Sequence, residues 1–299
     1  MSAADSTLRV WADMVKLSHS VFALPFALVA TFLAARHLED HRWPHADQIF
    51  LIIICMIGAR SAAMTFNRIV DAEIDARNPR TANRPLPAGR LSATKAWIMW
   101  ALSAVLFATG CLGFAFLYNN HWPILLSGPV LIFLCGYSFA KRFTRWSHYW
   151  LGVGLALAPA AAWIAIAPHS LGPSALVLMG IVVCWVGGFD IIYACQDIDA
   201  DQREGLYSLP SRMGPAAALW IARGSHLLAI IGLVYLGRLE NLGSAFAVGV
   251  AAAALLLIIE NSMVRPGDYR RVNIAFFTLN GLVSLVLAGA TITDLAMHG

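Results

Sequence analysis

The chain has 299 residues, of which 59% are hydrophobic and only 13% are charged, with a net charge of +4 and a mean hydropathy of +0.67. Soluble globular proteins carry about 45–50% apolar and about 25% charged residues. The composition therefore excludes an ordinary cytosolic enzyme, a disordered chain and a nucleic-acid-binding protein, and it favours a protein of the lipid bilayer.

Long apolar runs recur along the whole chain and are separated by short polar or Pro/Gly connections. A membrane-spanning helix needs about 20 predominantly apolar residues, and each run meets that length. We therefore predict an all-α, multi-pass membrane bundle of about nine transmembrane helices. The predicted spans are roughly 18–36, 48–72, 95–118, 122–140, 148–167, 172–197, 215–236, 242–262 and 272–294.

The basic residues indicate how the chain is oriented in the membrane. With nine spans, sixteen of the 21 Lys and Arg residues fall on the side of the N-terminus, three fall on the other side and two lie within spans. Loops rich in Lys and Arg stay on the cytoplasmic side. We expect a multi-pass protein of the cell (inner) membrane whose basic loops face the cytoplasm.

Acidic residues gather in two short segments, at the predicted cytoplasmic ends of the second and sixth spans. Residues four apart lie about 6 Å from each other on one helix face. In the first segment this spacing aligns Asn67, Asp71 and Asp75; in the second it aligns Tyr193, Asp197 and Asp201, with Asp190 two turns before Asp197. Carboxylates within a membrane-spanning segment are costly, so we interpret them as functional residues.

Like charges four residues apart destabilise a helix, so each acidic segment needs a cation. Mg²⁺ takes oxygen ligands and is usually held by one or two carboxylates together with substrate phosphates. Four predicted spans separate the two segments, and an even number returns the chain to the same face. We therefore predict that both segments hold Mg²⁺ at one cytoplasmic pocket, and that the chain contains two similar halves.

Basic side chains near these segments complete a predicted anion site, because Arg binds phosphate or carboxylate through a two-pronged fork. Three of these residues lie in a turn rich in Pro and Gly, which holds them in place. Two lie in the connection between the fourth and fifth predicted spans, and one follows the second acidic segment. These residues are Arg80, Asn83, Arg84, Lys141, Arg142 and Arg212.

A metal and an anion site at the mouth of a membrane protein imply a lipid diphosphate as substrate. Metal ions stabilise a leaving diphosphate, and an aromatic interior can stabilise an allylic cation. A different class, a membrane cation transporter, remains the alternative; against it, the acids cluster at one face, whereas transport sites lie near the middle of the bilayer.

Two stretches of sequence carry a family resemblance. Asn67-Arg-Ile-Val-Asp71-Ala-Glu-Ile-Asp75, followed by Arg80-Thr-Ala-Asn83-Arg84-Pro-Leu-Pro, resembles the first signature of the UbiA superfamily of intramembrane aromatic prenyltransferases. Asp190-Ile-Ile-Tyr193-Ala-Cys-Gln-Asp197-Ile-Asp-Ala-Asp201 resembles the second. The resemblance covers the whole chain and implies a single UbiA-like membrane domain over 1–299, with halves at roughly 15–145 and 146–265 and a ninth span at 272–294.

The resemblance also implies roles for individual residues. The metal would be held by Asn67, Asp71, Asp75, Asp197 and Asp201. Asp190 and Tyr193 match positions that line the reaction centre, where Asp190 would orient the aromatic acceptor or take its proton. Arg84, Lys141 and Arg142 would bind the diphosphate or the acceptor carboxylate, and His19 would lie near the acceptor site.

The implied reaction is the Mg²⁺-dependent transfer of a polyprenyl group from polyprenyl diphosphate to an aromatic acid in ubiquinone or menaquinone biosynthesis. Two positions depart from many relatives, Arg68 and Tyr207, and they suggest a side branch. The run 204–214 resembles the branch of alternative menaquinone biosynthesis, so the acceptor is of the 4-hydroxybenzoate or the dihydroxynaphthoate type. A heme- or chlorophyll-type acceptor is the alternative within the family. Prenyl chain length and oligomeric state are not predicted.

Overall fold

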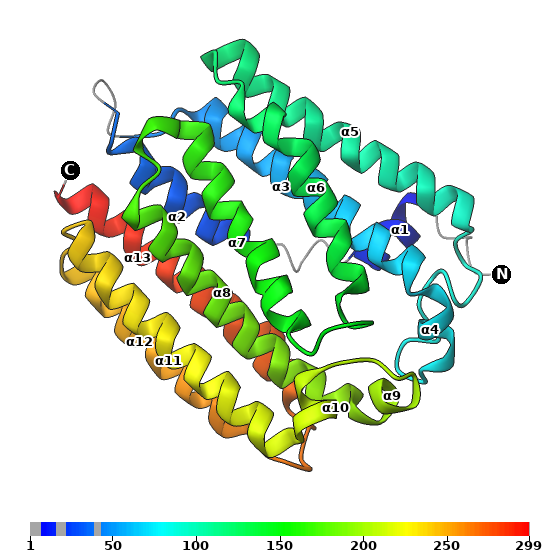
Figure 1. The fold of residues 1–299 in the computed structure, drawn as a ribbon. Coiled ribbons are helices and arrows are strands. Elements are labelled where there is room, and N and C mark those ends of the chain that lie inside the picture. The colour runs from blue at the N-terminus through cyan, green and yellow to red at the C-terminus, as the bar shows by residue number, and fades with distance from the viewer. Residues whose placement is uncertain (1–6, 16–21, 39–42, 299) are drawn as a thin grey trace. The chain divides into compact units, whose positions relative to one another are not determined.

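The protein is described by a computed structural model over residues 7–15, 22–38 and 43–298. Most of these residues are helical (Figure 1), and none of them belongs to a β-strand. The structure thus confirms the all-α, multi-pass fold predicted from the apolar runs.

Eight helices in the described part of the chain are long and apolar enough to cross a membrane. Their ends fall within a few residues of the predicted boundaries, at the polar and Pro/Gly connections. These helices are α3 (Ala46–Val70), α5 (Ala93–Tyr118), α6 (Trp122–Ala140), α7 (Ser147–Ile166), α8 (Pro173–Ala194), α11 (Pro215–Leu239), α12 (Ser244–Met263) and α13 (Asn280–His298), which continues the π-helix η4 (Ile274–Leu279).

The first predicted span is shorter in the structure than in the prediction. Helix α2 covers Leu24–Ala35, and twelve residues rise about 18 Å, short of the roughly 30 Å of a hydrocarbon core. Pro25 lies in the first turn of α2, where a residue without a backbone N–H fits best. The earlier part of the prediction, over 18–21, lies outside the described residues.

Shorter helices occupy the connections between spans. They are α1 (Thr7–Val15), α4 (Ala72–Arg77), η2 (Pro168–Ser170), η3 (Cys195–Asp197), α9 (Ile198–Arg203) and α10 (Leu209–Met213). Helix α4 follows α3 after Asp71, and α9 follows α8 after η3, so each of these short helices carries the last aspartate of an acidic segment.

The chain divides into two compact units, residues 1–20 with 50–139, and residues 21–49 with 140–299. Within the first unit, α3 and α5 approach so closely that a Cβ on Gly58 would lie 2.6 Å from the backbone nitrogen of Phe107. Small residues allow such close packing between membrane helices. The Trp11 indole donates a hydrogen bond of 2.9 Å to Thr65 Oγ1 and fastens α1 to α3.

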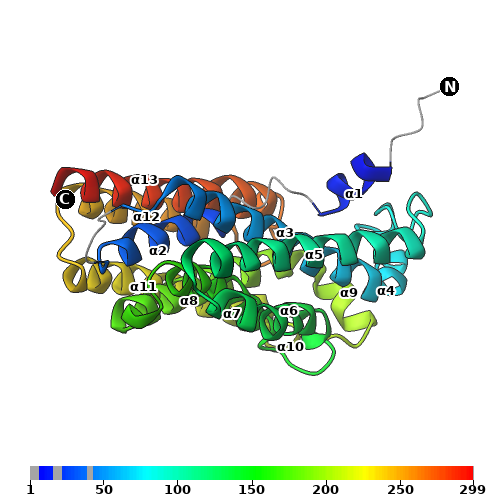
Figure 2. The same ribbon diagram turned by 90° about the horizontal axis from the view of Figure 1, so that it is seen from above.

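In the second unit, α8 packs against α7 and α11, while α12 and α13 run side by side in both views (Figures 1 and 2). A buried polar chain joins three of these helices. Trp185 Nε1 donates to Asn280 Oδ1 at 2.7 Å, and Asn280 Nδ2 donates to Glu260 Oε1 at 2.8 Å. Polar groups inside a membrane bundle need such internal partners, because lipid offers none.

Large apolar side chains remain on the outer faces of the helices. Phe116, Ile132 and Val248 are 83%, 75% and 69% exposed. Contiguous exposed apolar surface is costly in water, whereas the same side chains are favourable against lipid tails. The helices are therefore apolar around their circumference, as membrane spans are. The predicted division into two similar halves stays a prediction.

Candidate active site

The first acidic segment begins where α3 ends. The backbone breaks at Asp71, with φ −94° and ψ 4°, and α4 starts at the next residue. The helical hydrogen bonds continue through the break, from Asp71 N to Asn67 O at 3.0 Å and from Asp75 N to Asp71 O at 2.8 Å. Asn67 Nδ2 donates to Asp71 Oδ2 at 2.8 Å, so two of the predicted metal ligands contact each other.

Asp75 is buried, and Arg84 is its partner. Arg84 Nη1 donates to both carboxylate oxygens, at 2.8 Å to Oδ1 and 2.6 Å to Oδ2. The loop between them consists of successive turns, and Thr81 Oγ1 donates to the backbone oxygen of Asp75 at 2.9 Å. The structure therefore places Arg84, predicted to bind an anion, on the carboxylate at the end of the first acidic segment.

Two other predicted anion ligands on this loop, Arg80 and Asn83, are exposed. The backbone oxygen of Asn83 accepts a hydrogen bond of 2.7 Å from Arg90 Nη2, which closes the loop. Arg68, the departure inside the first signature, donates from Nη1 to Asn67 Oδ1 at 3.1 Å. Arg68 thus orients the Asn67 amide, whose other end holds Asp71.

The second acidic segment repeats this local arrangement. After α8 the chain makes the 3₁₀ turn η3, and Asp197, with φ −107° and ψ 8°, caps the start of α9. In α4 and in α9 one aspartate precedes the helix and a second is its fourth residue, Asp75 in the first case and Asp201 in the second. Asp197 and Asp201 are 8% and 4% exposed, so both carboxylates are buried.

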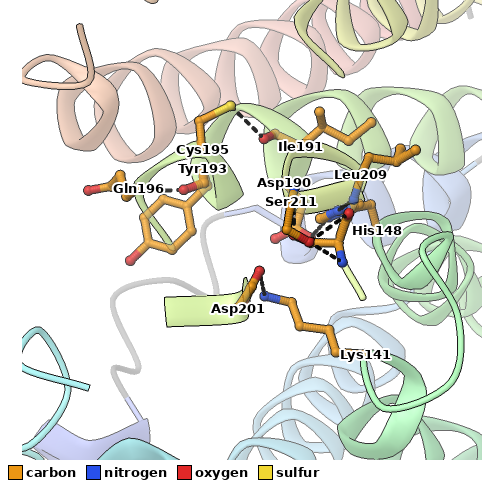
Figure 3. A network of polar contacts seen from close by, with 11 residues as sticks. Lys141, His148, Asp190, Ile191, Tyr193, Cys195, Gln196, Asp201, Leu209 and Ser211 are labelled. Atoms are coloured by element: carbon orange, nitrogen blue, oxygen red, sulfur yellow. Dashed lines mark hydrogen bonds and ion pairs between the residues drawn. The ribbon is translucent and has the colours of Figure 1, made fainter. Parts of the chain in front are cut away.

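Lys141, in the connection between α6 and α7, faces Asp201 (Figure 3). Its Nζ lies 3.7 Å from Asp201 Oδ2, an ion pair beyond hydrogen-bond distance, and that buried oxygen has no hydrogen-bond partner among the described residues. The backbone oxygen of Lys141 accepts a hydrogen bond of 2.6 Å from Tyr207 N. The neighbouring Arg142 is exposed.

Asp190 is held by a residue that the sequence analysis did not single out. His148 Nδ1 lies 2.7 Å from Asp190 Oδ2, and Leu209 N donates to His148 Nε2 at 3.2 Å (Figure 3). His148 is completely buried in the first turn of α7. A titratable side chain entering an apolar span was the available signal for it.

Tyr193 points away from Asp190 (Figure 3) and joins an aromatic cluster. Its ring centroid lies 4.3 Å from that of Phe276 and 6.1 Å from that of Phe277. Phe189 and Phe22 also contact Phe276, at 5.1 Å and 5.5 Å. Phe276 and Phe277 lie on η4, and the sequence analysis predicted an aromatic interior without identifying these residues.

Arg212, on α10, is exposed and lies over the ring of Tyr207, with 3.9 Å between its Cζ atom and the ring centroid. Its Nη2 also donates to the backbone oxygen of Gly205 at 3.4 Å. Both contacts lie within the loop that follows the second acidic segment. His19, predicted to lie near the acceptor, falls outside the described residues.

The donor set fits a hard divalent cation that also binds substrate. Among the described residues, no three His, Cys, Asp or Glu side chains are close enough to share a metal ion. Each acidic segment instead offers a pair of aspartates, and Asp201 has a buried oxygen without a hydrogen bond. This matches Mg²⁺, which uses one or two carboxylates and completes its shell with water and substrate phosphates.

Residues 23–282 match the model of the UbiA prenyltransferase family. A 4-hydroxybenzoate octaprenyltransferase of Vibrio vulnificus is 32% identical over 266 residues, which cover 87% of each chain. A protein of the same name from Saccharophagus degradans is 29% identical and covers 97% of this chain and 93% of its own.

Solved structures agree with this family. The apo structure of a UbiA homolog from Aeropyrum pernix has a TM-score of 0.81 and 30% identity, over 92% of this chain and 98% of that one. A UbiA homolog from Archaeoglobus fulgidus, bound to GPP and Mg²⁺, has a TM-score of 0.71 over 96% of this chain and 99% of that one; its 16% identity shows a shared fold. The chain is thus a membrane prenyltransferase, not the alternative cation transporter, and it belongs to the UbiA prenyltransferase family.

Proposed function

We propose that this protein transfers a polyprenyl group from polyprenyl diphosphate to an aromatic acid of the 4-hydroxybenzoate or dihydroxynaphthoate type, with Mg²⁺, in ubiquinone or menaquinone biosynthesis. The relatives named 4-hydroxybenzoate octaprenyltransferase support this acceptor class. The observation that carries the proposal is the buried carboxylate of Asp201, whose Oδ2 makes no hydrogen bond to a described residue and has Lys141 Nζ 3.7 Å away. A buried carboxylate is costly unless it is both paired and hydrogen-bonded, and an ion pair at this distance leaves room for a closer cation.

Asn67, Asp71 and Asp75 in the first segment, with Asp197 and Asp201 in the second, would hold Mg²⁺. The metal would neutralise negative charge on the diphosphate as it leaves. Support comes from the oxygen-only donors and from the repeated pattern of aspartates at the starts of α4 and α9.

Cationic side chains beside these carboxylates would bind the substrate's anions. Arg84 already lies within hydrogen-bond distance of Asp75, and Lys141 lies 3.7 Å from Asp201. A diphosphate places new negative oxygens beside each acidic segment, and Arg binds such groups through its fork. We assign Arg80, Asn83, Arg84, Lys141, Arg142 and Arg212 to the diphosphate or to the carboxylate of the acceptor.

The reaction breaks the bond between the allylic carbon and the diphosphate oxygen and forms a bond from that carbon to the aromatic ring. The displaced ring proton leaves with solvent. The ring centroid of Phe276 lies 4.3 Å from that of Tyr193 and 4.6 Å from that of Phe277. These three rings would stabilise the allylic cation through their π faces. Asp190 would take the proton of the acceptor hydroxyl, which raises the ring's nucleophilicity, and would return it to that oxygen when the ring proton leaves, so that one proton is released overall.

We place the active site at the cytoplasmic side of the inner membrane. Four membrane-length helices, α5 to α8, separate the two acidic segments along the chain, and an even number of crossings returns the chain to one face. The excess of Lys and Arg on that face supports the cytoplasmic assignment.

The test uses the full-length protein in lipid nanodiscs with polyprenyl diphosphate and each of the two acceptor types. Product formation should stop with a chelator and return with Mg²⁺. Asp71→Ala and Asp197→Ala should each lower turnover by about a hundredfold or more, as expected when charge stabilisation in the transition state is lost.

The chain offers two matched controls, Glu73 and Asp199, which are exposed and occupy the second position of α4 and of α9. Glu73→Ala and Asp199→Ala should keep nearly full activity. Full turnover in the presence of chelator, or in the Asp71 and Asp197 variants, would refute the metal role. Prenylation of a heme or chlorophyll precursor in place of either aromatic acid would refute the acceptor assignment.

A further inference from the structure

His148 contacts Asp190 on one side and Leu209, the first residue of α10, on the other, and it is fully buried between them. The three groups come from α7, α8 and α10, and the close view shows the imidazole directed at the carboxylate (Figure 3). Among the described residues, His148 is the one hydrogen-bond partner of the Asp190 carboxylate, and it uses Oδ2. The Asp190 side chain keeps 13% of its surface exposed.

The direction of these bonds determines where the histidine proton lies. A backbone N–H can only donate, so Nε2 of His148 must accept from Leu209. An imidazole whose Nε2 accepts carries its single proton on Nδ1 and is uncharged. His148 therefore donates from Nδ1 to Asp190 Oδ2, and Asp190 is the acceptor of that bond.

We propose that His148 is a positioning residue that holds one oxygen of Asp190 and leaves the other directed at the aromatic acceptor. This inference rests on the proposed function, in which Asp190 takes the hydroxyl proton of the acceptor. His148 itself takes no proton, because the lone pair of Nε2 is used by the Leu209 amide. The proton moves from the acceptor oxygen to Asp190 Oδ1, and the histidine keeps the carboxylate at its place and angle. Orientation of a base by a second group is an established source of rate.

Two conservative substitutions separate the two hydrogen bonds. His148→Asn places an amide N–H near the position of Nδ1 and keeps the donor to Asp190. His148→Gln places its amide near the position of Nε2, where it can accept from Leu209, and it loses the donor to Asp190. We expect the Asn variant to stay within about threefold of wild-type kcat, and the Gln variant to lose about tenfold or more.

The KM for polyprenyl diphosphate should stay unchanged in both variants, because the lost bond concerns the acceptor side. The matched control is Tyr149→Phe, one residue further along α7, which removes the partly buried 2.6 Å hydrogen bond between Tyr149 and Ser225. Tyr149→Phe should leave kcat near the wild-type value. Thermal unfolding in nanodiscs should show similar midpoints for the Asn and Gln variants.

A double-mutant cycle tests whether His148 acts through Asp190. Once Asp190→Asn has removed the base, adding His148→Gln should lower kcat by less than about twofold. Full additivity would overturn the proposal, and so would wild-type kcat in the Gln variant. Equal losses of activity and of thermal midpoint in the Asn and Gln variants would show a structural role and would also overturn it.

The two proposals fail in different ways. If the wild-type protein prenylates neither aromatic acid, the proposed function fails, and this inference fails with it. If the wild-type protein is active and the Gln variant is as active, only the role of His148 fails.

Discussion

The buried chain of Trp185, Asn280 and Glu260 offers a quantitative test of how this bundle is held together. Asn280→Leu keeps the size of the side chain and removes three hydrogen bonds, to Trp185 (2.7 Å), to Glu260 (2.8 Å) and to the backbone oxygen of Ala275 (3.1 Å). It leaves the Trp185 N–H unpaired, and it leaves both Glu260 oxygens unpaired, because Oε2 has no partner in the described part of the chain.

Each buried polar group left without a partner costs about 1–3 kcal/mol. Measured hydrogen bonds between membrane helices fall at the low end, because the unfolded chain also finds partners in the bilayer. For two such groups we expect a loss of about 2–4 kcal/mol in the free energy of unfolding. At about 2–4 °C per kcal/mol for a chain of this order of size, the thermal midpoint should fall by about 4–16 °C.

The assay is thermal unfolding of the purified protein in nanodiscs, followed by tryptophan fluorescence and by circular dichroism. Activity should fall as well, because Asn280 also holds the backbone of η4, which carries Phe276 and Phe277 beside Tyr193. Two variants check the reasoning. Glu260→Gln keeps an oxygen that accepts from Asn280 and should be nearly neutral.

Replacing both residues, in Asn280→Leu with Glu260→Leu, should restore part of the lost stability, because the buried Glu260 carboxylate that lacked a donor is removed, while the Trp185 N–H stays unpaired. A thermal midpoint for Asn280→Leu within about 2 °C of wild type would refute this estimate of the cost of unpaired buried groups. A double variant that is less stable than Asn280→Leu alone would refute it too.

Four further substitutions have definite expected outcomes. Arg84→Lys replaces a two-pronged donor with a point charge and should raise the KM for polyprenyl diphosphate about tenfold with little change in folding, measured by steady-state kinetics. Lys141→Met should also raise that KM, and an unchanged value would remove it from the anion site. Gly188→Ala should destabilise the bundle, because its Cβ would collide with the His226 ring, whereas Gly180→Ala on the same helix meets nothing within 4 Å and should be neutral or stabilising by up to about 1 kcal/mol. Equal midpoints for the two alanine variants would contradict the packing seen at α8.

The spans were predictable because one physical requirement governs them all. A backbone inside lipid must satisfy its own hydrogen bonds, so long apolar runs can only be helices. The ends were predictable where a polar or Pro/Gly connection follows. The start of α2 was not, since Pro25 lies inside the apolar run and hydropathy alone does not register where a proline must sit.

The spacing of the acidic residues predicted that they share one helix face, but it did not predict which side chains from other helices contact them. The breaks at Asp71 and Asp197 do not alter composition or period, and the π-helix η4 leaves no trace in the apolar pattern. Contacts between residues far apart in the sequence are harder still to predict. His148 and Asp190 are 42 residues apart on different helices, and no periodicity within α7 or α8 indicates that they form a hydrogen bond.

Residues 204–214 carry the resemblance that predicts the acceptor type, and they also contact residues of the proposed site. The resemblance of this stretch points to a dihydroxynaphthoate acceptor, and the backbone of the stretch contacts two residues, the backbone of Lys141 and the side chain of His148. Tyr207 N donates to Lys141 O, and Leu209 N donates to His148, which in turn holds Asp190. The side chains of the same segment, Tyr207 and Arg212, stack on each other at its surface. These contacts to Lys141 and His148 use the backbone of the segment, so we expect Tyr207→Phe to leave both contacts, and with them the position of Asp190, unchanged.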